Sequence, residues 1–276
     1  MKNKFHNIVA RACSGALFVT IILCSILAGA YICAAMMIAI LIWSMLEFYN
    51  IIIKERVRAS KIIGVSTGVV LFVASFFYAQ NFVSERIFLY IVPLIILIFV
   101  SQLYSTDKNS FRTIAYTITG IAYIALPITV FTGMMFHSAN GEYNPQIMLG
   151  FFILLWTNDT FAYLTGIKFG SRRLFERISQ KKSWEGFWGG FVSTIAMAVI
   201  IANLFQIIPF YHWMAIAAII VVFGVYGNLV ESLLKRNLKI KDSGNFLPGH
   251  GGILDRFDAV LIAAPMVFIY LKLFVI

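Results

Sequence analysis

Acidic, basic and glycine residues are concentrated near the C-terminus, between Ser232 and Asp258. This segment reads SLLKRNLKIKDSGNFLPGHGGILDRFD. Basic side chains bind phosphate, glycines let backbone N–H groups approach oxygen atoms, and carboxylates at a helix start can hold a divalent metal ion. A solvated turn of Lys and Gly alone would not need the acids. The combination therefore indicates phosphoryl or nucleotidyl transfer.

Five acidic residues lie in apolar segments, where a carboxylate costs about 2.5–3.5 kcal/mol and needs a partner, water or a metal ion. They are Glu47, Asp159, Glu231, Asp255 and Asp258. Near the end of its segment, Glu47 could simply snorkel or pair with Lys54. The other four acids are all in the C-terminal half.

Helical spacing groups several of these acids with other polar residues. Asn228, Glu231 and Lys235 fall on one helix face, and Asp255 and Asp258 share a face at the start of the last apolar segment. An ion pair between Glu231 and Lys235 is the purely structural alternative for that pair.

A second polar constellation lies upstream. Asp159 shares a helix face with Tyr163 and Gly166, and the basic loop 170–185 then brings Lys181, Lys182 and Ser183 beside Glu185. This arrangement could cradle a triphosphate, although basic residues after a membrane span also follow from topology alone. We expect the glycines that open the next apolar segment to serve close helix packing rather than ligand binding; they are Gly186, Gly189 and Gly190.

Other kinds of chemistry have no support in the sequence. There is no Ser/His/Asp order, Cys/His pair or His-x-x-x-His helix, so acyl hydrolysis and zinc chemistry are not indicated. His250, between glycines, is expected to be a hydrogen-bonding loop residue without an acid–base role.

The elements that must position these residues are membrane helices. Of the 276 residues 61% are hydrophobic and 12% charged, and the mean hydropathy is +0.88. Soluble domains have about 45–50% apolar and about 25% charged residues. We therefore expect an all-α polytopic membrane protein whose apolar segments are each long enough to cross a bilayer. There are nine of them, at 12–29, 31–48, 62–79, 87–104, 114–136, 147–168, 186–206, 211–234 and 254–275.

The basic residues predict the orientation. With the N-terminus in the cytoplasm, nine crossings place all of the 22 Lys and Arg residues except Arg86 and Lys272 on the cytoplasmic side. We divide the chain into N-terminal helices in residues 1–110 and a catalytic region in residues 111–276, with cytoplasmic loops at 170–185 and 235–253.

The segment from Ser232 to Asp258 resembles the C-terminal pattern of the CDP-diacylglycerol synthases, also called phosphatidate cytidylyltransferases. It fits S-x-x-K-R-x(4)-K-D-x-G-x(2)-L-P-x-H-G-G-x-x-D-R-x-D at every fixed position. Asp159–Tyr163 with Gly166, and Ser179–Gly186, also look like segments of this family. The resemblance covers residues 150–276, and the N-terminal half matches only as a set of apolar spans.

The resemblance implies an enzyme of phospholipid biosynthesis that transfers CMP from CTP to phosphatidic acid, giving CDP-diacylglycerol and pyrophosphate. It implies Mg²⁺, with a second metal or K⁺ as an optional addition, and a homodimer in the bacterial inner membrane, with the site on the cytoplasmic side and no nucleic-acid partner. The residues implied to hold metal are Asp255, Asp258, Asp242, Asn228, Glu231 and Asp159. Those implied to act in catalysis are Lys235, Arg236, Lys241, Asp242, Asp255 and Asp258. The three basic residues of this set are implied to bind phosphates. Those implied to bind substrate are Ser179, Lys182, Ser183, Glu185, Ser232, His250, Gly251, Gly252 and Arg256.

Two positions depart from the family pattern. Asn228 stands where the family commonly has Asp, so a neutral amide replaces a carboxylate ligand, and Gln180 stands where Pro is common. The first change bears on metal affinity and the second on loop stiffness.

Other classes of protein fit the sequence less well. A secondary transporter would place acids near the bilayer midplane and have inverted repeats, neither of which is evident here. A CDP-alcohol phosphatidyltransferase would carry D-x-x-D-G-x-x-A-R, which is missing. A lipid kinase remains open, since it would use the same charges and metal to transfer a terminal phosphate.

Overall fold

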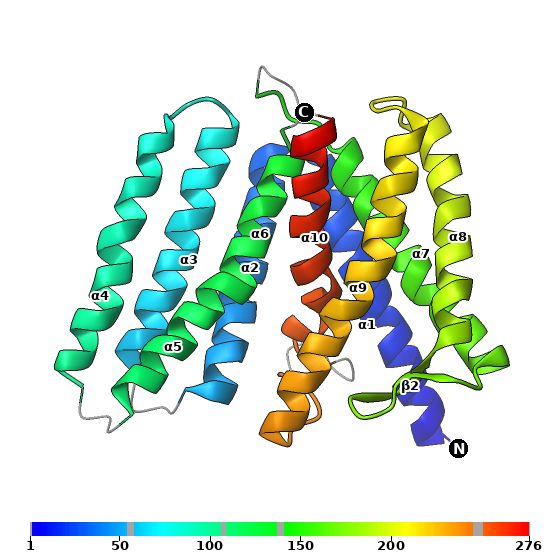
Figure 1. The fold of residues 1–276 in the computed structure, drawn as a ribbon, viewed down its shortest axis with the longest axis horizontal. Helices are drawn as coiled ribbons and strands as arrows, with labels where there is room; N and C mark the ends of the chain where they lie inside the picture. The colour runs from blue at the N-terminus through cyan, green and yellow to red at the C-terminus, as the bar shows by residue number, and fades with distance from the viewer. Residues whose placement is uncertain (1, 54–57, 106–108, 137–140, 245–250, 276) are drawn as a thin grey trace. The chain divides into compact units, whose positions relative to one another are not determined.

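A computed structural model describes residues 2–53, 58–105, 109–136, 141–244 and 251–275, with only the backbone described at 2–14, 58 and 180. These residues form two compact units, and Figure 1 labels their helices. The N-terminal unit comprises residues 1–143 and 238–257, and the C-terminal unit comprises residues 144–237 and 258–276.

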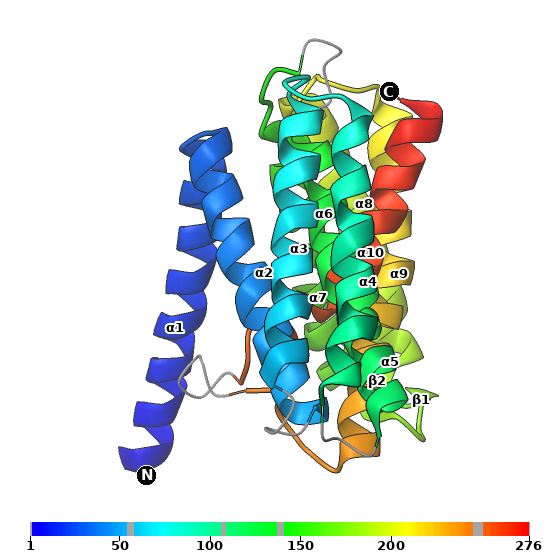
Figure 2. The ribbon, with the colours of Figure 1, turned by 90° about the vertical axis from the view of Figure 1, so that its left-hand side faces the viewer.

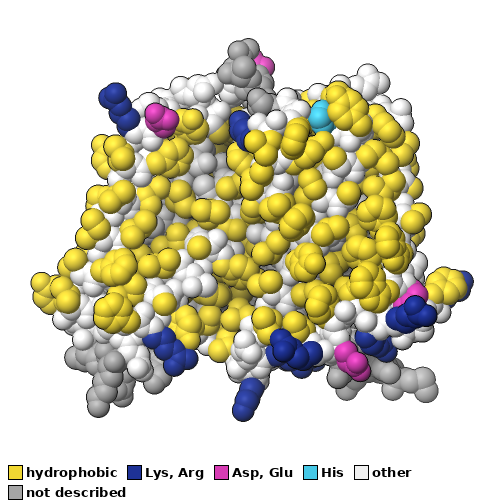
Figure 3. Space-filling view, viewed as in Figure 1, with side chains coloured by type: hydrophobic (Ala, Val, Ile, Leu, Met, Phe, Trp, Pro, Cys, Tyr) yellow, Lys and Arg dark blue, Asp and Glu magenta, His cyan; other side chains and the backbone are white. Residues whose placement is uncertain are grey.

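The described part of the chain is almost entirely helical, as its composition predicts. Among the described residues, eight helices are long and apolar enough to span a membrane, and the part of the first helix whose side chains are described, Gly15–Leu27, is a shorter apolar helix. The nine predicted segments coincide with these nine helices. In the view of Figure 3, hydrophobic side chains cover the lengths of the helices, while charged side chains lie near helix ends. The chain is therefore a multi-pass membrane protein.

The N-terminal unit begins with a helical hairpin of α1 (Lys2–Leu27) and α2 (Ala30–Ile52), which lie side by side in Figure 2. Gly29 joins them with a φ of 114° that favours glycine. Figures 1 and 2 also show α3 (Arg58–Ala79) and α4 (Ile91–Leu103) side by side. The helices of this unit are α1 (Lys2–Leu27), α2 (Ala30–Ile52), α3 (Arg58–Ala79), the 3₁₀ turn η2 (Glu85–Tyr90), α4 (Ile91–Leu103), α5 (Ser110–Gly120), the π-helical turn η3 (Ile121–Ala125), α6 (Leu126–Phe131) and the 3₁₀ turn η4 (Thr132–Met134).

One irregular helix runs through the predicted span at 114–136. Its π-helical turn ends at Ala125, and Pro127, whose nitrogen cannot donate the regular helical hydrogen bond, follows after Leu126. This helix packs against α2 and α3, and the buried Tyr49 hydroxyl donates to the carbonyl of Thr117 at 2.8 Å. These contacts group residues 111–143 with the N-terminal helices, whereas the predicted division of the chain lies at residue 110.

The C-terminal unit contains four long helices and a short hairpin. They are α7 (Gln146–Phe169), β1 (Arg173–Phe175), β2 (Ser179–Ser183), α8 (Trp184–Leu204), α9 (Phe210–Leu238) and α10 (Leu254–Phe274), with α10 beginning in the N-terminal unit. The predicted loop 170–185 is thus partly an antiparallel β-hairpin. Strand pairing satisfies backbone groups while the chain reverses between two antiparallel helices.

Glycines bring α7 and α8 together. A Cβ atom on Gly186 would lie 2.8 Å from the carbonyl oxygen of Ala162, and one on Gly190 would lie 2.6 Å from the Asn158 side chain. A Cβ on Gly189 would collide with Thr165. The predicted packing role of these glycines is therefore confirmed, and their approach sets the width of the site described next.

Candidate active site

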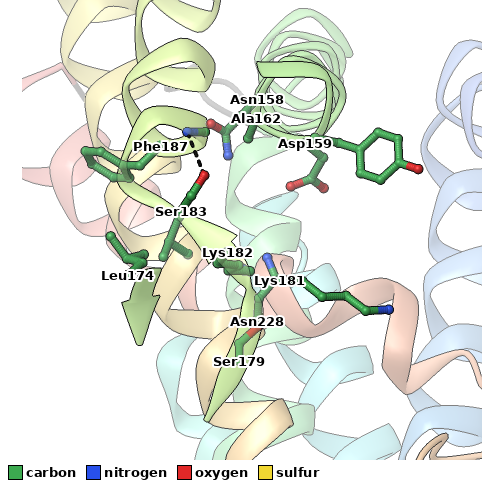
Figure 4. A pocket seen from close by; sticks show the side chains of 13 residues that line it. Asn158, Asp159, Ala162, Leu174, Ser179, Lys181, Lys182, Ser183, Phe187 and Asn228 are labelled. Carbon is green, nitrogen blue, oxygen red and sulfur yellow. Dashed lines mark hydrogen bonds between the residues drawn. The ribbon is translucent and has the colours of Figure 1, made fainter. Parts of the chain in front are cut away.

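A pocket of about 310 Å³ lies in the C-terminal unit, where α7 ends, α8 begins and α9 nears its end (Figure 4). Its lining combines a carboxylate, two lysines, amides and hydroxyls with apolar side chains. The lining residues are Asn158, Asp159, Ala162, Tyr163, Leu174, Ser179, Lys181, Lys182, Ser183, Gly186, Phe187, Val225 and Asn228. Concave sites of about 300–1,000 Å³ with a few convergent polar groups are typical of small-molecule binding.

Two side chains hold the hairpin against the first turn of α8. The buried Ser183 Oγ accepts a hydrogen bond from the Gly186 amide at 3.1 Å and so caps the helix. The Glu185 carboxylate accepts the Ser171 hydroxyl at 2.7 Å and the backbone amides of Ser171 and Arg172. Both were predicted to bind substrate; in the structure Ser183 lines the pocket, whereas Glu185 holds the residues that lead into the hairpin.

Lys182 is the centre of charge in the pocket. Burial lowers the pKa of its ammonium group, while the negative charges of Asp258, Asp159 and Glu231 act in the opposite direction. These acids come from α10, α7 and α9. Three helices of the unit thus direct negative charge toward a single lysine on β2.

The predicted helix face on α9 is present. Glu231 is 2% exposed, and its Oε2 forms an ion pair with Lys235 Nζ at 2.6 Å. The structural alternative weighed for this pair is therefore observed. One turn earlier, Asn228 lines the pocket, and its Nδ2 donates to the Gly224 carbonyl at 2.9 Å.

Close packing between α9 and α10 brings Asp258 to this cluster. A Cβ on Gly227 would collide with the backbone of Asp258 and Ala259. Asp258 is 8% exposed, and its Oδ1 accepts the Ala259 amide at 2.8 Å. The structure thus gathers Asp159, Lys182, Asn228, Glu231, Lys235 and Asp258 at one end of the C-terminal unit.

Asp255 belongs to the N-terminal unit and bonds to the backbone. Its carboxylate accepts the Ser243 amide at 3.0 Å and the Gly252 amide at 2.8 Å, while Gly251 takes a φ of 83° beside it. Asp255 was predicted from the sequence as a metal ligand, and its use in shaping the loop was not expected.

The remaining predicted residues are placed as follows. Lys181 and Ser179 line the pocket, and Ser232 is half-buried on α9. Four others are exposed: Arg236, Lys241, Asp242 and Arg256. His250 lies outside the described residues. The shared metal site predicted for Asp242 and Asp255 with the residues of the C-terminal unit stays a prediction.

Two polar residues were not predicted as site residues from the sequence. Asn158 lines the pocket, is 3% exposed, and has an Oδ1 atom without a hydrogen-bond partner among the described residues. Its position one residue before Asp159, inside an apolar span, was an available signal. The second is Glu47, which bonds to the same loop as Asp255. No local pattern could connect it to a loop about two hundred residues later.

Comparison with known proteins identifies the family of the chain. The fold and the site together define the class of protein: a multi-pass helical membrane protein with lysines and acidic residues around a pocket. The model of the cytidylyltransferase family matches residues 9–274, so the chain belongs to this family.

Individual relatives carry a more specific name. The phosphatidate cytidylyltransferase of Bacillus subtilis is 36% identical over 208 residues, which is 72% of each chain. That of Thermotoga maritima is 35% identical over 66% of this chain and 69% of the relative, and that of Rickettsia bellii is 32% identical over 78% and 92%.

Proposed function

We propose that this protein is a phosphatidate cytidylyltransferase that transfers CMP from CTP to phosphatidic acid. The observation that carries this proposal is the pocket in which Lys182 meets carboxylates from three helices, in a chain similar to enzymes of that name. The products are CDP-diacylglycerol, a precursor in phospholipid biosynthesis, and pyrophosphate.

The chemistry suits a site without a general base. A phosphate oxygen of phosphatidate, already anionic, attacks the α-phosphorus of CTP; a P–O bond forms there, and the P–O bond to the β-phosphate breaks. Positioning and neutralisation of phosphate charge supply the catalysis. Lys182 and Ser183 contact CTP, and Lys235, Arg236 and Lys241 bind phosphates.

The residues present fit a Mg²⁺ ion that shares its coordination with substrate. Asp159, Asp258 or Glu231 would offer the hard carboxylate oxygens that Mg²⁺ prefers, one or two of them at a time, and Asn228 would add a neutral amide oxygen. Among the described residues no three His, Cys, Asp or Glu side chains are close enough to hold a metal ion by themselves. Mg²⁺ is usually held by one or two carboxylates plus substrate phosphates, and the bound ion would neutralise phosphate charge. K⁺ or a second metal ion belongs to the same proposal.

The dependence of the rate on Mg²⁺ tests this part of the proposal. Asn228→Asp replaces a neutral ligand with an anionic one, so the Mg²⁺ concentration for half-maximal rate should fall by about 10-fold. Full activity of the wild type in excess chelator would contradict metal dependence.

The substrates and the basic residues support a location in the bacterial inner membrane. Phosphatidate stays in the bilayer while CTP arrives from water, so the site belongs at an interface. The basic hairpin, with Arg172, Arg173, Lys181 and Lys182, favours the cytoplasmic side and a cytoplasmic N-terminus. A homodimer, implied by family resemblance, is part of the proposal and can be tested by cross-linking in membranes.

The deciding experiment follows labelled phosphate. Purified protein in detergent is given phosphatidate, Mg²⁺ and CTP labelled at the α or the γ phosphate. Label from the α position in lipid, with γ label in pyrophosphate, is the expected result. Label from the γ position in lipid would instead mean a lipid kinase, and no label in lipid would favour a transporter.

A further inference from the structure

Glu47 lies in the apolar helix α2 but does not behave as an interfacial side chain. It is 8% exposed, so snorkelling does not describe it, and Lys54, the other predicted partner, lies outside the described residues. The carboxylate instead contacts the glycine-rich loop, whose described ends are Ser243–Gly244 and Gly251–Ile253. Glu47 and these ends of the loop belong to the same unit.

Three hydrogen bonds converge on this carboxylate. Oε1 accepts the Ile253 amide at 3.1 Å, while Oε2 accepts the Leu254 amide at 2.9 Å and the Ser243 hydroxyl at 3.3 Å. Ile253 and Leu254 stand at the N-terminus of α10, where backbone N–H groups have no partner within the helix and negative charge is favourable. Glu47 therefore caps α10 from a different helix.

Two glycines leave room for the carboxylate. A Cβ atom on either Gly244 or Gly252 would collide with the carboxylate group of Glu47. The backbone at both described ends of the loop thus lies against the Glu47 carboxylate. A larger side chain at Gly244 or Gly252 would displace this carboxylate. This gives a physical reason for glycine at these two positions that is independent of phosphate binding.

Asp255 ties together the same two ends of the loop. It accepts the amides of Ser243 and Gly252, so Ser243 is bonded to Asp255 through its amide and to Glu47 through its hydroxyl. Two carboxylates, one from α2 and one from α10, therefore hold the loop. Asp255 and Asp258 follow within the first two turns of the helix that Glu47 caps.

We propose that Glu47 is a positioning residue, which fixes the glycine-rich loop and the start of α10 for turnover without touching substrate. Among the described residues, its hydrogen bonds all go to loop and helix groups. A carboxylate is required because the amide nitrogen of a glutamine at this position would face a backbone N–H donor at one of its two bonding sites. The effect on turnover rests on the proposed function, whereas the effect on the loop does not.

The test compares three variants of the full-length protein in detergent. Glu47→Gln and Glu47→Ala should lower kcat for cytidylyl transfer by about 10- to 100-fold, the range for loss of groups that orient a site. Hydrogen exchange of peptides covering residues 243–254 should become faster in both. The control, Tyr49→Phe, removes another buried hydrogen bond of α2, the bond to Thr117, and should leave kcat and loop exchange as in the wild type.

Chemical rescue separates positioning from a general loss of stability. Added formate should partly restore kcat in Glu47→Ala, because the small carboxylate can occupy the space left between the glycines, and it should have no effect on the wild type. Wild-type kcat in Glu47→Gln, unchanged loop exchange, or the absence of rescue in folded Glu47→Ala would each overturn the proposal. If the wild type itself transfers no cytidylyl group, the proposed function fails, and loop exchange alone decides whether Glu47 holds the loop.

Discussion

At the scale of single residues, Lys182 combines a basic role with an environment that works against its charge. Burial lowers the pKa of its ammonium group, and the acids around it compensate only in part. A buried ammonium group is stabilised more by a bound polyphosphate than an exposed lysine is, because water no longer screens the attraction between the opposite charges. Its protonation and CTP binding should therefore be coupled.

This coupling predicts a pH dependence. An ordinary lysine has a pKa of about 10.4. Because the pKa of Lys182 is lowered, its side chain loses the proton at a lower pH than an ordinary lysine does, and the KM for CTP should rise as the pH passes through that lowered pKa. In Lys182→Arg the guanidinium stays protonated, so this rise should disappear. Measuring KM for CTP against pH checks the prediction. Lys181→Arg, at an exposed lysine of the same pocket, is the control that should keep the rise.

Asp255 and Asp258 differ in what they contact, so their variants should differ. Asp258→Asn removes a buried negative charge facing Lys182 and should reduce turnover by about 100-fold or more while the glycine-rich loop keeps its exchange rate. Asp255→Asn should reduce turnover and also speed loop exchange, because it weakens bonds to Ser243 and Gly252. Initial rates and hydrogen exchange measure both effects. Equal loop exchange in the two variants would contradict this assignment.

At the scale of elements, close helix packing places the reactive groups. The acids of α9 and α10 can face the same lysine because Gly227 lets the two helices approach, just as the glycines of α8 admit α7. The β-hairpin then carries Lys182 across the ends of these helices, held by the Ser183 cap and the Glu185 bonds. The positions of the reactive side chains in the pocket therefore depend on how closely the backbones of neighbouring helices approach each other.

A pair of glycines on α9 tests this view. A Cβ on Gly227 would collide with the backbone of α10, whereas one on Gly224 would lie 3.4 Å from Leu155 and 3.8 Å from Ala259, within ordinary contact distance. Gly227→Ala should cost about 1–3 kcal/mol of stability and reduce activity, as overpacking does. Gly224→Ala, one turn away, should be tolerated. Thermal unfolding in detergent and initial rates provide the comparison, and equal behaviour of the two variants would refute it.

At the scale of the whole molecule, the distribution of basic residues relates the active site to the membrane. Lys181 lies on the hairpin, and Arg86 lies in η2, on opposite sides in the predicted topology. The basic excess near the pocket also favours approach of CTP, since opposite charges speed encounter at low salt.

The predicted orientation can be tested by labelling. In a variant without the three native cysteines, Lys181→Cys should react with a membrane-impermeant thiol reagent in inverted vesicles but not in intact spheroplasts. Arg86→Cys should show the opposite pattern. Labelling of both positions from the same side would contradict the predicted number of crossings between them.

The sequence by itself determined the membrane helices and the class of chemistry. The nine predicted segments match the helices because the insertion of a segment depends on its own length and hydropathy, which are local properties. The charged motifs likewise indicated phosphate chemistry, since residue type alone limits what a side chain can bind.

Only the tertiary structure decided which of these groups meet. Lys182 lies among acids from three helices, Asp255 bonds to loop amides, and Glu47 caps a helix that begins about two hundred residues later. Such contacts depend on how far each helix is rotated and how closely two backbones approach. The rotation of a helix and the distance between two backbones are set by the packing of segments that are distant in the sequence. They therefore cannot be predicted from the periodicity of one segment.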